Sequence, residues 1–202
     1  MPDTGAPHFI PFADPTDLVR DWPALSEDVA EAVADGLDEA GNAGIGSNVV
    51  QTVKTDVFSS TDDSFTTVTG LTATITPSSD TAKVLIVAQV VLSTSIGNGD
   101  SAHLRLAGGN TSTYVGDADA PRTRAVSGLN NFTTAPSYGR QWSAEAETLV
   151  FLDEPADDTP VTYSVEMLVG AGTGFVNRSG WDGASTAATR GASSITLIEV
   201  AA

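Results

Sequence analysis

The sequence predicts an all-β protein: an antiparallel β-sandwich or jelly roll of about eight or nine strands, preceded by an extended arm and one amphipathic α-helix. From residue 49 onward, short apolar or alternating runs are separated by loops rich in Gly, Ser, Thr, Asn and Asp. Such spacing is typical of sandwiches and jelly rolls. No helical pattern interrupts this part of the chain, which argues against an α/β fold.

The chain divides into four segments by composition. Residues 1–15, with "PHFIPFADP", are expected to form an extended arm, because proline blocks both helix and central strand. Residues 16–40 are expected to be helical. Residues 41–48, "GNAGIGSN", have the composition of a flexible linker. Residues 49–202 are expected to form the β-sandwich body.

The helix is predicted from a single apolar stripe. Leu25, Val29, Val33 and Leu37 follow one another at intervals of four residues, so they lie on one side of a helix. Acidic residues fill the other side. A helix this short is marginal alone in water. The stripe must therefore be buried on the body or on copies of itself, and its spacing permits a trimeric bundle.

The strands of the body are expected where apolar residues alternate or run together. They are placed at residues 49–58, 65–76, 83–92, 103–106, 113–115, 122–129, 141–152, 161–169 and 193–200. The run at 83–92 is almost continuously apolar. Such a run is typical of a strand buried on both faces, including burial at an interface.

Charge excludes several partners. The chain has 26 acidic and 9 basic residues, for a net charge of −17, and both the first 44 residues and the body are acidic. Such a surface repels nucleic acid and anionic membranes, so neither is expected as a partner. No apolar run is long enough for a transmembrane helix. The scarcity of lysine suits a halophilic host, where salt screens self-repulsion, and equally suits the codon usage of a high-GC genome.

Few residues suggest chemistry. The chain has no cysteine, and its two histidines, His8 and His103, are far apart in the sequence and belong to no triad or zinc motif. The aspartate pairs fit turns better than cation sites. The Asn-x-Ser/Thr triplets at Asn110, Asn131 and Asn177 are expected to be chance matches. We therefore expect a protein that is not an enzyme and has no catalytic residue, cofactor or metal site.

Two loops rich in small residues carry aromatic side chains that could form a binding surface. They are "NNFTTAPSYGRQW" and "GAGTGFVNRSGWDGAST". Rigid aromatic rings among adaptable polar residues bind sugars and proteins well. The candidate receptor-binding residues are Phe132, Tyr138, Trp142, Phe175 and Trp181. The two tryptophans could instead close the ends of the sandwich, since tryptophan is usually largely buried.

Several stretches stand in order along the body: "VVQTVKTDVFSSTDDSFTTVTGLTATITPSSDTAKVLI", "LVFLDEPADDTPVTYSVEM", "FVNRSG" and "SSITLIEV". In this order and spacing they resemble the small C-terminal β-domain of tail fibres and other appendages of tailed viruses. The resemblance covers roughly residues 49–202. The upstream stretch "FADPTDLVRDWPALSEDVAEAV" resembles the segment that links fibre proteins to the virion. Unlike long fibres, this chain has almost no shaft.

The resemblance implies a non-enzymatic virion protein, a homotrimeric tail fibre or appendage that displays binding loops to a host surface glycan or protein. It implies docking on other virion structural proteins through residues 1–40. The candidate docking residues are Phe9, Ile10, Phe12, Leu18 and Trp22. A capsid decoration or turret protein remains an alternative, and so does a carbohydrate-binding module of a cell surface.

Overall fold

The computed structural model describes residues 29–34, 45–95, 97, 99–131 and 142–200. Residues 29–34 are helical, inside the segment expected to form a helix, and Val33 in this helix is 45% exposed. The expected arm at residues 1–15 and the rest of the expected helix lie outside the described residues. No helix in the described part of the chain has the length and apolar character needed to cross a membrane.

Ten strands and one short 3-10 helix form the described body. In chain order they are β1 (Ile45–Lys54), β2 (Phe58–Ser60), β3 (Thr66–Ile75), β4 (Lys83–Thr94), β5 (Asp100–Ala107), η2 (Thr111–Thr113), β6 (Ser127–Asn131), β7 (Glu145–Asp153), β8 (Val161–Ala171), β9 (Gly174–Val176) and β10 (Ser193–Val200).

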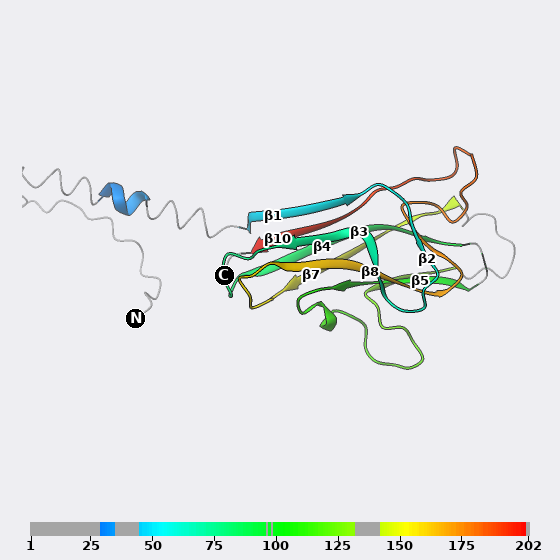
Figure 1. The fold of residues 1–202 in the computed structure, drawn as a ribbon, viewed down its shortest axis with the longest axis horizontal. Coiled ribbons are helices and arrows are strands. Elements are labelled where there is room, and N and C mark those ends of the chain that lie inside the picture. The colour runs from blue at the N-terminus through cyan, green and yellow to red at the C-terminus, as the bar shows by residue number, and fades with distance from the viewer. Residues whose placement is uncertain (1–28, 35–44, 96, 98, 132–141, 201–202) are drawn as a thin grey trace, which may run out of the picture.

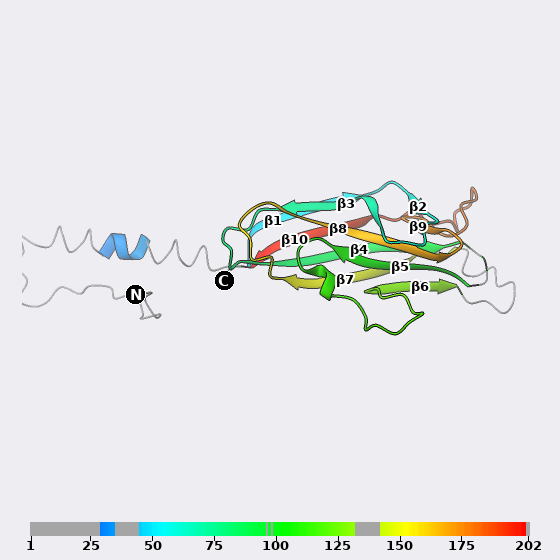
Figure 2. The same ribbon diagram turned by 60° about the horizontal axis from the view of Figure 1, so that its bottom comes forward.

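The strands form two packed antiparallel sheets (Figures 1 and 2). One sheet has six strands in the order β1-β10-β4-β9-β2, with β7 also paired to β4. Because β4 pairs with β10 and with β7 over the same residues, these two strands lie on its opposite edges. The other sheet has the order β3-β8-β5-β6. The predicted all-β sandwich is confirmed.

The core lies between the sheets and follows from alternation along the strands. In β8 and β10, buried residues alternate with partly exposed ones, because successive side chains of a strand point to opposite faces. Leu71, Ile86, Leu104, Met167 and Leu197 are among the fully buried side chains of this core. Apolar burial on this scale is the main stabilising contribution to such a fold.

A buried polar contact lies within this core. The carboxylate of Asp153 is fully buried and accepts hydrogen bonds from the Tyr163 hydroxyl (2.6 Å) and from the backbone N–H of Asn110 (3.1 Å). Burial, and then the neighbouring Asp153 carboxylate, raise the pKa of Tyr163. A side chain on Gly109 would overlap both groups, so glycine is required there. The contact ties the turn after β5 to the end of β7.

Several expected boundaries differ from the structure. β1 begins at Ile45, inside the expected linker, because Ile45 already pairs with Val200 of the last strand. The expected strand at 49–58 is two strands, β1 and β2, which pair with different partners. The strand expected at 122–129 is only Ser127–Asn131. β9 has only three residues and was not expected.

Two further expectations are wrong for the single chain. Residues 113–115 do not form a strand, since Thr111–Thr113 is a 3-10 helix with Thr111 bonded back to Gly108. The run at 83–92 is not buried on both faces. Its residues alternate between buried and partly exposed, because only one face of β4 meets the second sheet.

Candidate binding surface at the loop end of the sandwich

The body has two distinct ends, and β4 runs from one to the other. At its start, Lys83 pairs with Val200, beside the beginning of β1. At its end, Thr94 pairs with Gly174 of β9. We call the first the base and the second the loop end. Figures 1 and 2 show the loop after β9 at the end opposite the start of β1. Ile45, the first described residue of the body, therefore lies at the base, roughly 40 Å from the loop end, at about 3.3 Å per residue of β4.

The loop at residues 177–192 starts from a rigid anchor, Asn177. This residue is fully buried and has a left-handed backbone, with φ of 65°. Its side-chain amide donates hydrogen bonds to the carbonyls of Lys54 (2.8 Å) and Asp56 (3.0 Å) and accepts one from the Ser193 hydroxyl (2.6 Å). Asn177 thus joins the ends of β1 and β10. A glycan could not be attached to this buried amide in the folded protein.

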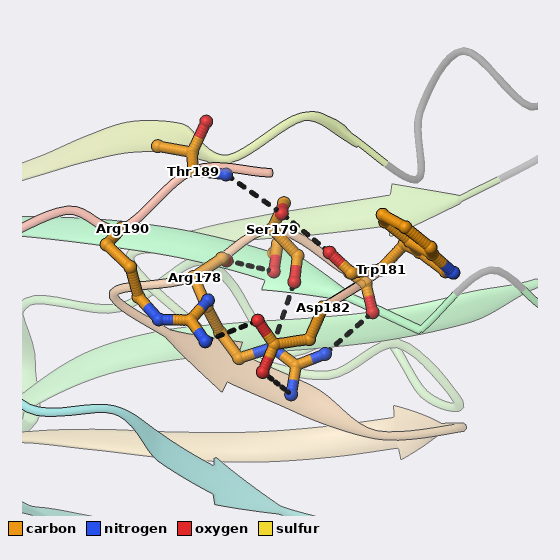
Figure 3. Close-up of polar contacts among 8 residues, drawn as sticks. Arg178, Ser179, Trp181, Asp182, Thr189 and Arg190 are labelled. Carbon is orange, nitrogen blue, oxygen red and sulfur yellow. Dashed lines mark hydrogen bonds and ion pairs between the residues drawn. The ribbon is translucent and has the colours of Figure 1, made fainter. Parts of the chain in front are cut away.

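Arg178 organises the first turn of the loop (Figure 3). Its guanidinium lies 4.0 Å from the centre of the Phe175 ring, within the range of a cation–π contact. Its Nε and Nη2 donate to the carbonyls of Ser179 and Gly180, each at 2.9 Å. Its Nη1 lies 3.3 Å from a carboxylate oxygen of Asp182. The guanidinium of Arg178 therefore covers the Phe175 ring.

A second arginine closes the neck of the same loop. Arg190 pairs with the other carboxylate oxygen of Asp182 and forms an isolated antiparallel bridge with Arg178. Ser179, the residue that follows Arg178, is fully buried. Its hydroxyl donates to the Trp181 carbonyl (2.8 Å) and accepts from the Thr189 backbone N–H (3.2 Å). These contacts fix the position of the Trp181 backbone.

The two tryptophans predicted as binding residues meet at this end. Their ring centroids are 4.2 Å apart, with an interplanar angle of 65°. Both residues are half-buried, so they close part of the sandwich end and also leave ring surface exposed. A side chain on Gly183 would overlap the Trp181 ring. Trp142 comes from the segment before β7, and Trp181 from the loop after β9.

The structure therefore brings together Trp142 and Trp181, and it covers Phe175 with Arg178. The other candidate residues lie outside the described residues: Phe132, Tyr138, Phe9, Ile10, Phe12, Leu18 and Trp22. Sequence reasoning did not find the roles of Arg178, Asp182 and Arg190. The sequence shows these three charged residues only as "NRSGWD" and, further on, "TR". That they lie together is visible only from the bridge between Arg178 and Arg190, which joins the two arms of the loop.

A second surface feature lies beside the four-stranded sheet, where a hollow of about 550 Å³ is lined by Arg105, Arg122 and Arg124. These are three of the nine basic residues in the chain. Arg105 stacks 4.2 Å from the Phe65 ring centre and bonds Glu166 at 2.6 Å. The stretch "PRTR" carries two of these arginines, but sequence reasoning placed it in a strand.

The other two arginines of the hollow differ in their partners. Arg122 pairs with Asp119 in a solvent-exposed ion pair, which contributes little stability. Arg124 donates from Nε to the Gly116 carbonyl at 2.8 Å and contacts no carboxylate among the described residues. The guanidinium of Arg124 is therefore open to an anionic group.

The described residues contain no group of three or more His, Cys, Asp and Glu side chains that could hold a metal ion. His103 lies in β5, where partial burial lowers its pKa. In the described part of the chain, its side chain makes no hydrogen bond to a carboxylate or hydroxyl. At the loop end, the partly exposed rings of Trp142 and Trp181 and the exposed side chain of Arg190 are groups that can bind a partner.

Comparisons with known proteins give distant fold likenesses. No protein-family model matches the chain, and no curated protein matches it. A solved structure of the infectious bursal disease virus VP2 subviral particle matches with 11% identity and a TM-score of 0.38, covering 77% of this chain and 33% of that one. A structure of the Gx strain of the same virus matches with 20% identity and a TM-score of 0.36, covering 77% and 37%. This chain thus spans about a third of those proteins, and a superposition this loose assigns it no role.

Proposed function

We propose that this chain is a structural protein of a virion, an appendage of the tail-fibre kind that attaches at its base and displays its loop end to a host surface. The observation that carries the proposal is the separation of the two ends. The N-terminal segment joins the body at Ile45, beside Val200, while the loop after β9, which carries Trp181, lies at the opposite end of the body. The ordered motifs that resemble fibre domains also support it.

In this proposal the protein acts by binding and not by catalysis. The loop end offers the Trp142–Trp181 ring pair, with the guanidinium of Arg190, whose side chain is 54% exposed, in the same loop as Trp181. Exposed ring faces beside hydrogen-bonding groups suit a host surface glycan or protein. The rigid anchor at Asn177 supports the same role, since a site held in advance loses less entropy on binding.

Attachment to the virion is assigned to residues 1–40, which would contact other virion structural proteins. The chain would act as a homotrimer. Three loop ends on one appendage would bind together, so weak single contacts could give firm attachment. The apolar stripe that continues through Val29 and Val33 supports association between copies, because Val33 is 45% exposed in the single chain.

A capsid decoration or turret protein is the alternative within the same class, with the same body projecting from the head. The test compares the full chain with residues 41–202, which retain every strand of the body. Light scattering would give their mass, and sedimentation would measure their binding to candidate host cells and to empty capsids. Cell binding by both proteins supports the fibre role. Capsid binding that needs residues 1–40, without cell binding, supports decoration. If neither protein binds cells or capsids, both roles are wrong.

The arginine hollow favours one other candidate, a carbohydrate-binding module of a cell surface. Arg124 has an open guanidinium there, and Phe65, which stacks on Arg105 through one face of its ring, lines the same hollow. An acidic sugar would use both groups. Binding of carboxylated oligosaccharides, lost in Arg124→Ala and kept in Trp181→Ala, would favour this module over a fibre that binds through its loop end.

A further inference from the structure

The outer face of the six-stranded sheet has a row of apolar residues across four neighbouring strands. At the base, Val49 of β1 pairs with Ile198 of β10, Ile198 with Leu85 of β4, and Leu85 with Leu152 of β7. All four point away from the core. Val49 is 53% exposed and Leu152 is 45% exposed, and the other two are partly exposed. Contiguous exposed apolar residues of this kind can mark an interaction site.

The apolar surface continues one step towards the loop end, where Val87 of β4 pairs with Val150 of β7. Val150 is 47% exposed. Apart from Lys83, which pairs with Glu154 at the base, no outward-pointing residue of β1, β10, β4 and β7 in their paired stretch is charged. We call this surface the apolar face.

The outer face of the other sheet has a different character. Thr74 and Thr162 point outward there and are hydrogen-bonded at 2.8 Å. Arg105 and Glu166 form an ion pair on the same face. The absence of charge from the apolar face is therefore not a general property of this sandwich, and it requires its own explanation.

Net charge indicates which kind of partner would need an uncharged surface. With a net charge of −17, two copies of this chain repel each other wherever their acidic surfaces approach. Charged residues should therefore be absent from the surface through which copies contact one another. An unrelated acidic or basic partner would instead be recognised by complementary charges, and the apolar face offers none.

The size of this face can be estimated from the paired stretch of the four strands. The stretch is uncharged apart from Lys83, and it includes polar residues, such as Gln51, Thr196 and Gln89, on the loop-end side of the apolar row. Four strands spaced about 4.8 Å apart, over eight residues of about 3.3 Å each, give an area of roughly 500 Å² for each copy, of which the apolar row is the part at the base. In the proposed homotrimer, each copy would turn this face towards the three-fold axis. Three such faces would bury roughly 1,500 Å² in all, about 500 Å² for each copy, so this contact would act together with those of residues 1–40.

We infer that the apolar face is the surface through which copies of this chain pack on one another. The inference rests on the proposed homo-oligomer and names its contact surface in the body. It also gives the partly exposed side of β4 a function, since the second face of this apolar strand becomes buried between copies.

The absence of cysteine from the chain makes a residue-specific test possible. Two variants of the full chain each carry one cysteine, Val150→Cys on the apolar face and Thr72→Cys on the outer face of the other sheet. Both positions are exposed in the single chain. The measurements are the rate of maleimide labelling and the mass by light scattering, at low and at high salt. We expect an oligomer in which position 150 is labelled about tenfold or more slowly than position 72, because labelling must wait for the interface to open.

The other outcomes are informative. Equally fast labelling at both positions in an oligomer would overturn the inference and leave the proposed oligomer standing, held by another surface. A monomer labelled fast at both positions would overturn both. A monomer labelled slowly at position 150 would show that another segment of the same chain covers the face, which also overturns the inference. As a further check, Val150→Asp should break the contacts between the bodies of neighbouring copies, whereas Thr72→Asp should leave them intact.

Discussion

The hydroxyl of Ser193 donates a 2.6 Å hydrogen bond to the side-chain carbonyl of Asn177, and both residues are buried. This bond joins the first residue of the last strand to the start of the loop that carries Trp181. The same asparagine bonds the backbone where β1 ends. The folding of the body and the position of its loop end are therefore coupled at a single residue.

Replacing Asn177 with alanine should strongly destabilise the body. The change removes the bonds to the carbonyls of Lys54 and Asp56 and places alanine in a left-handed backbone. We expect a loss of about 2–4 kcal/mol in the free energy of unfolding, measured by thermal or denaturant unfolding. The control is Asn110→Ala, which removes one exposed side-chain hydrogen bond and should cost about 1 kcal/mol or less. Equal effects of the two changes would contradict the role of Asn177.

Replacing Gly183 with alanine should separate the two tryptophan rings. The new methyl group would overlap the Trp181 ring, so the ring must move from its position 4.2 Å from Trp142. Near-ultraviolet circular dichroism should lose the signal of the ring pair, with a small change in stability because the loop is at the surface. Gly116→Ala is the matched control, since a side chain there meets only the Ala125 carbonyl at ordinary distance. An unchanged spectrum for Gly183→Ala would show that the rings do not depend on this glycine.

The Tyr163–Asp153 contact predicts a loss of stability in alkali. Burial and the neighbouring carboxylate raise the pKa of Tyr163 in the folded protein above its ordinary value of 10.0. A raised pKa in the folded state means that stability is present below pH 10.0 and falls as the pH rises above it. Denaturant unfolding as a function of pH should show this fall.

Tyr163→Phe tests the assignment. The variant should be less stable near neutral pH by about 1–3 kcal/mol, because the buried Asp153 loses a donor. It should also show a shallower decline above pH 10.0, the ordinary tyrosine value. The same decline in both proteins would assign the alkaline transition to other groups.

The sequence predicted the sandwich well where one face of a strand is buried. β8 and β10 alternate clearly between buried and exposed residues, and their expected positions agree with the structure to within two residues. The turn that became η2 was less predictable, because Thr and Val fit a strand equally well. Its geometry depends on Thr111 bonding back to Gly108, three residues earlier, and on the buried Asp153, which is distant in the sequence and accepts from the Asn110 backbone.

The candidate surface was predicted only in part. Aromatic residues in small-residue loops indicated Trp142 and Trp181, which do meet. The arginines around Asp182 could not be predicted, since their contact needs both arms of a loop to come together. The apolar face was visible only as an unusually apolar strand at 83–92. Its extent across four strands depends on the register of β1, β10, β4 and β7.

The most direct test of the central proposal is the binding of the full chain to a panel of candidate host cells, with Trp181→Ala as the loop-end variant and Thr74→Ala as the control on an outer sheet face. The proposal predicts cell binding that falls about tenfold or more in Trp181→Ala, as for a truncated aromatic hot spot, and is unchanged in Thr74→Ala. Cell binding by the unchanged protein that is equally strong in Trp181→Ala would contradict host attachment through the loop end.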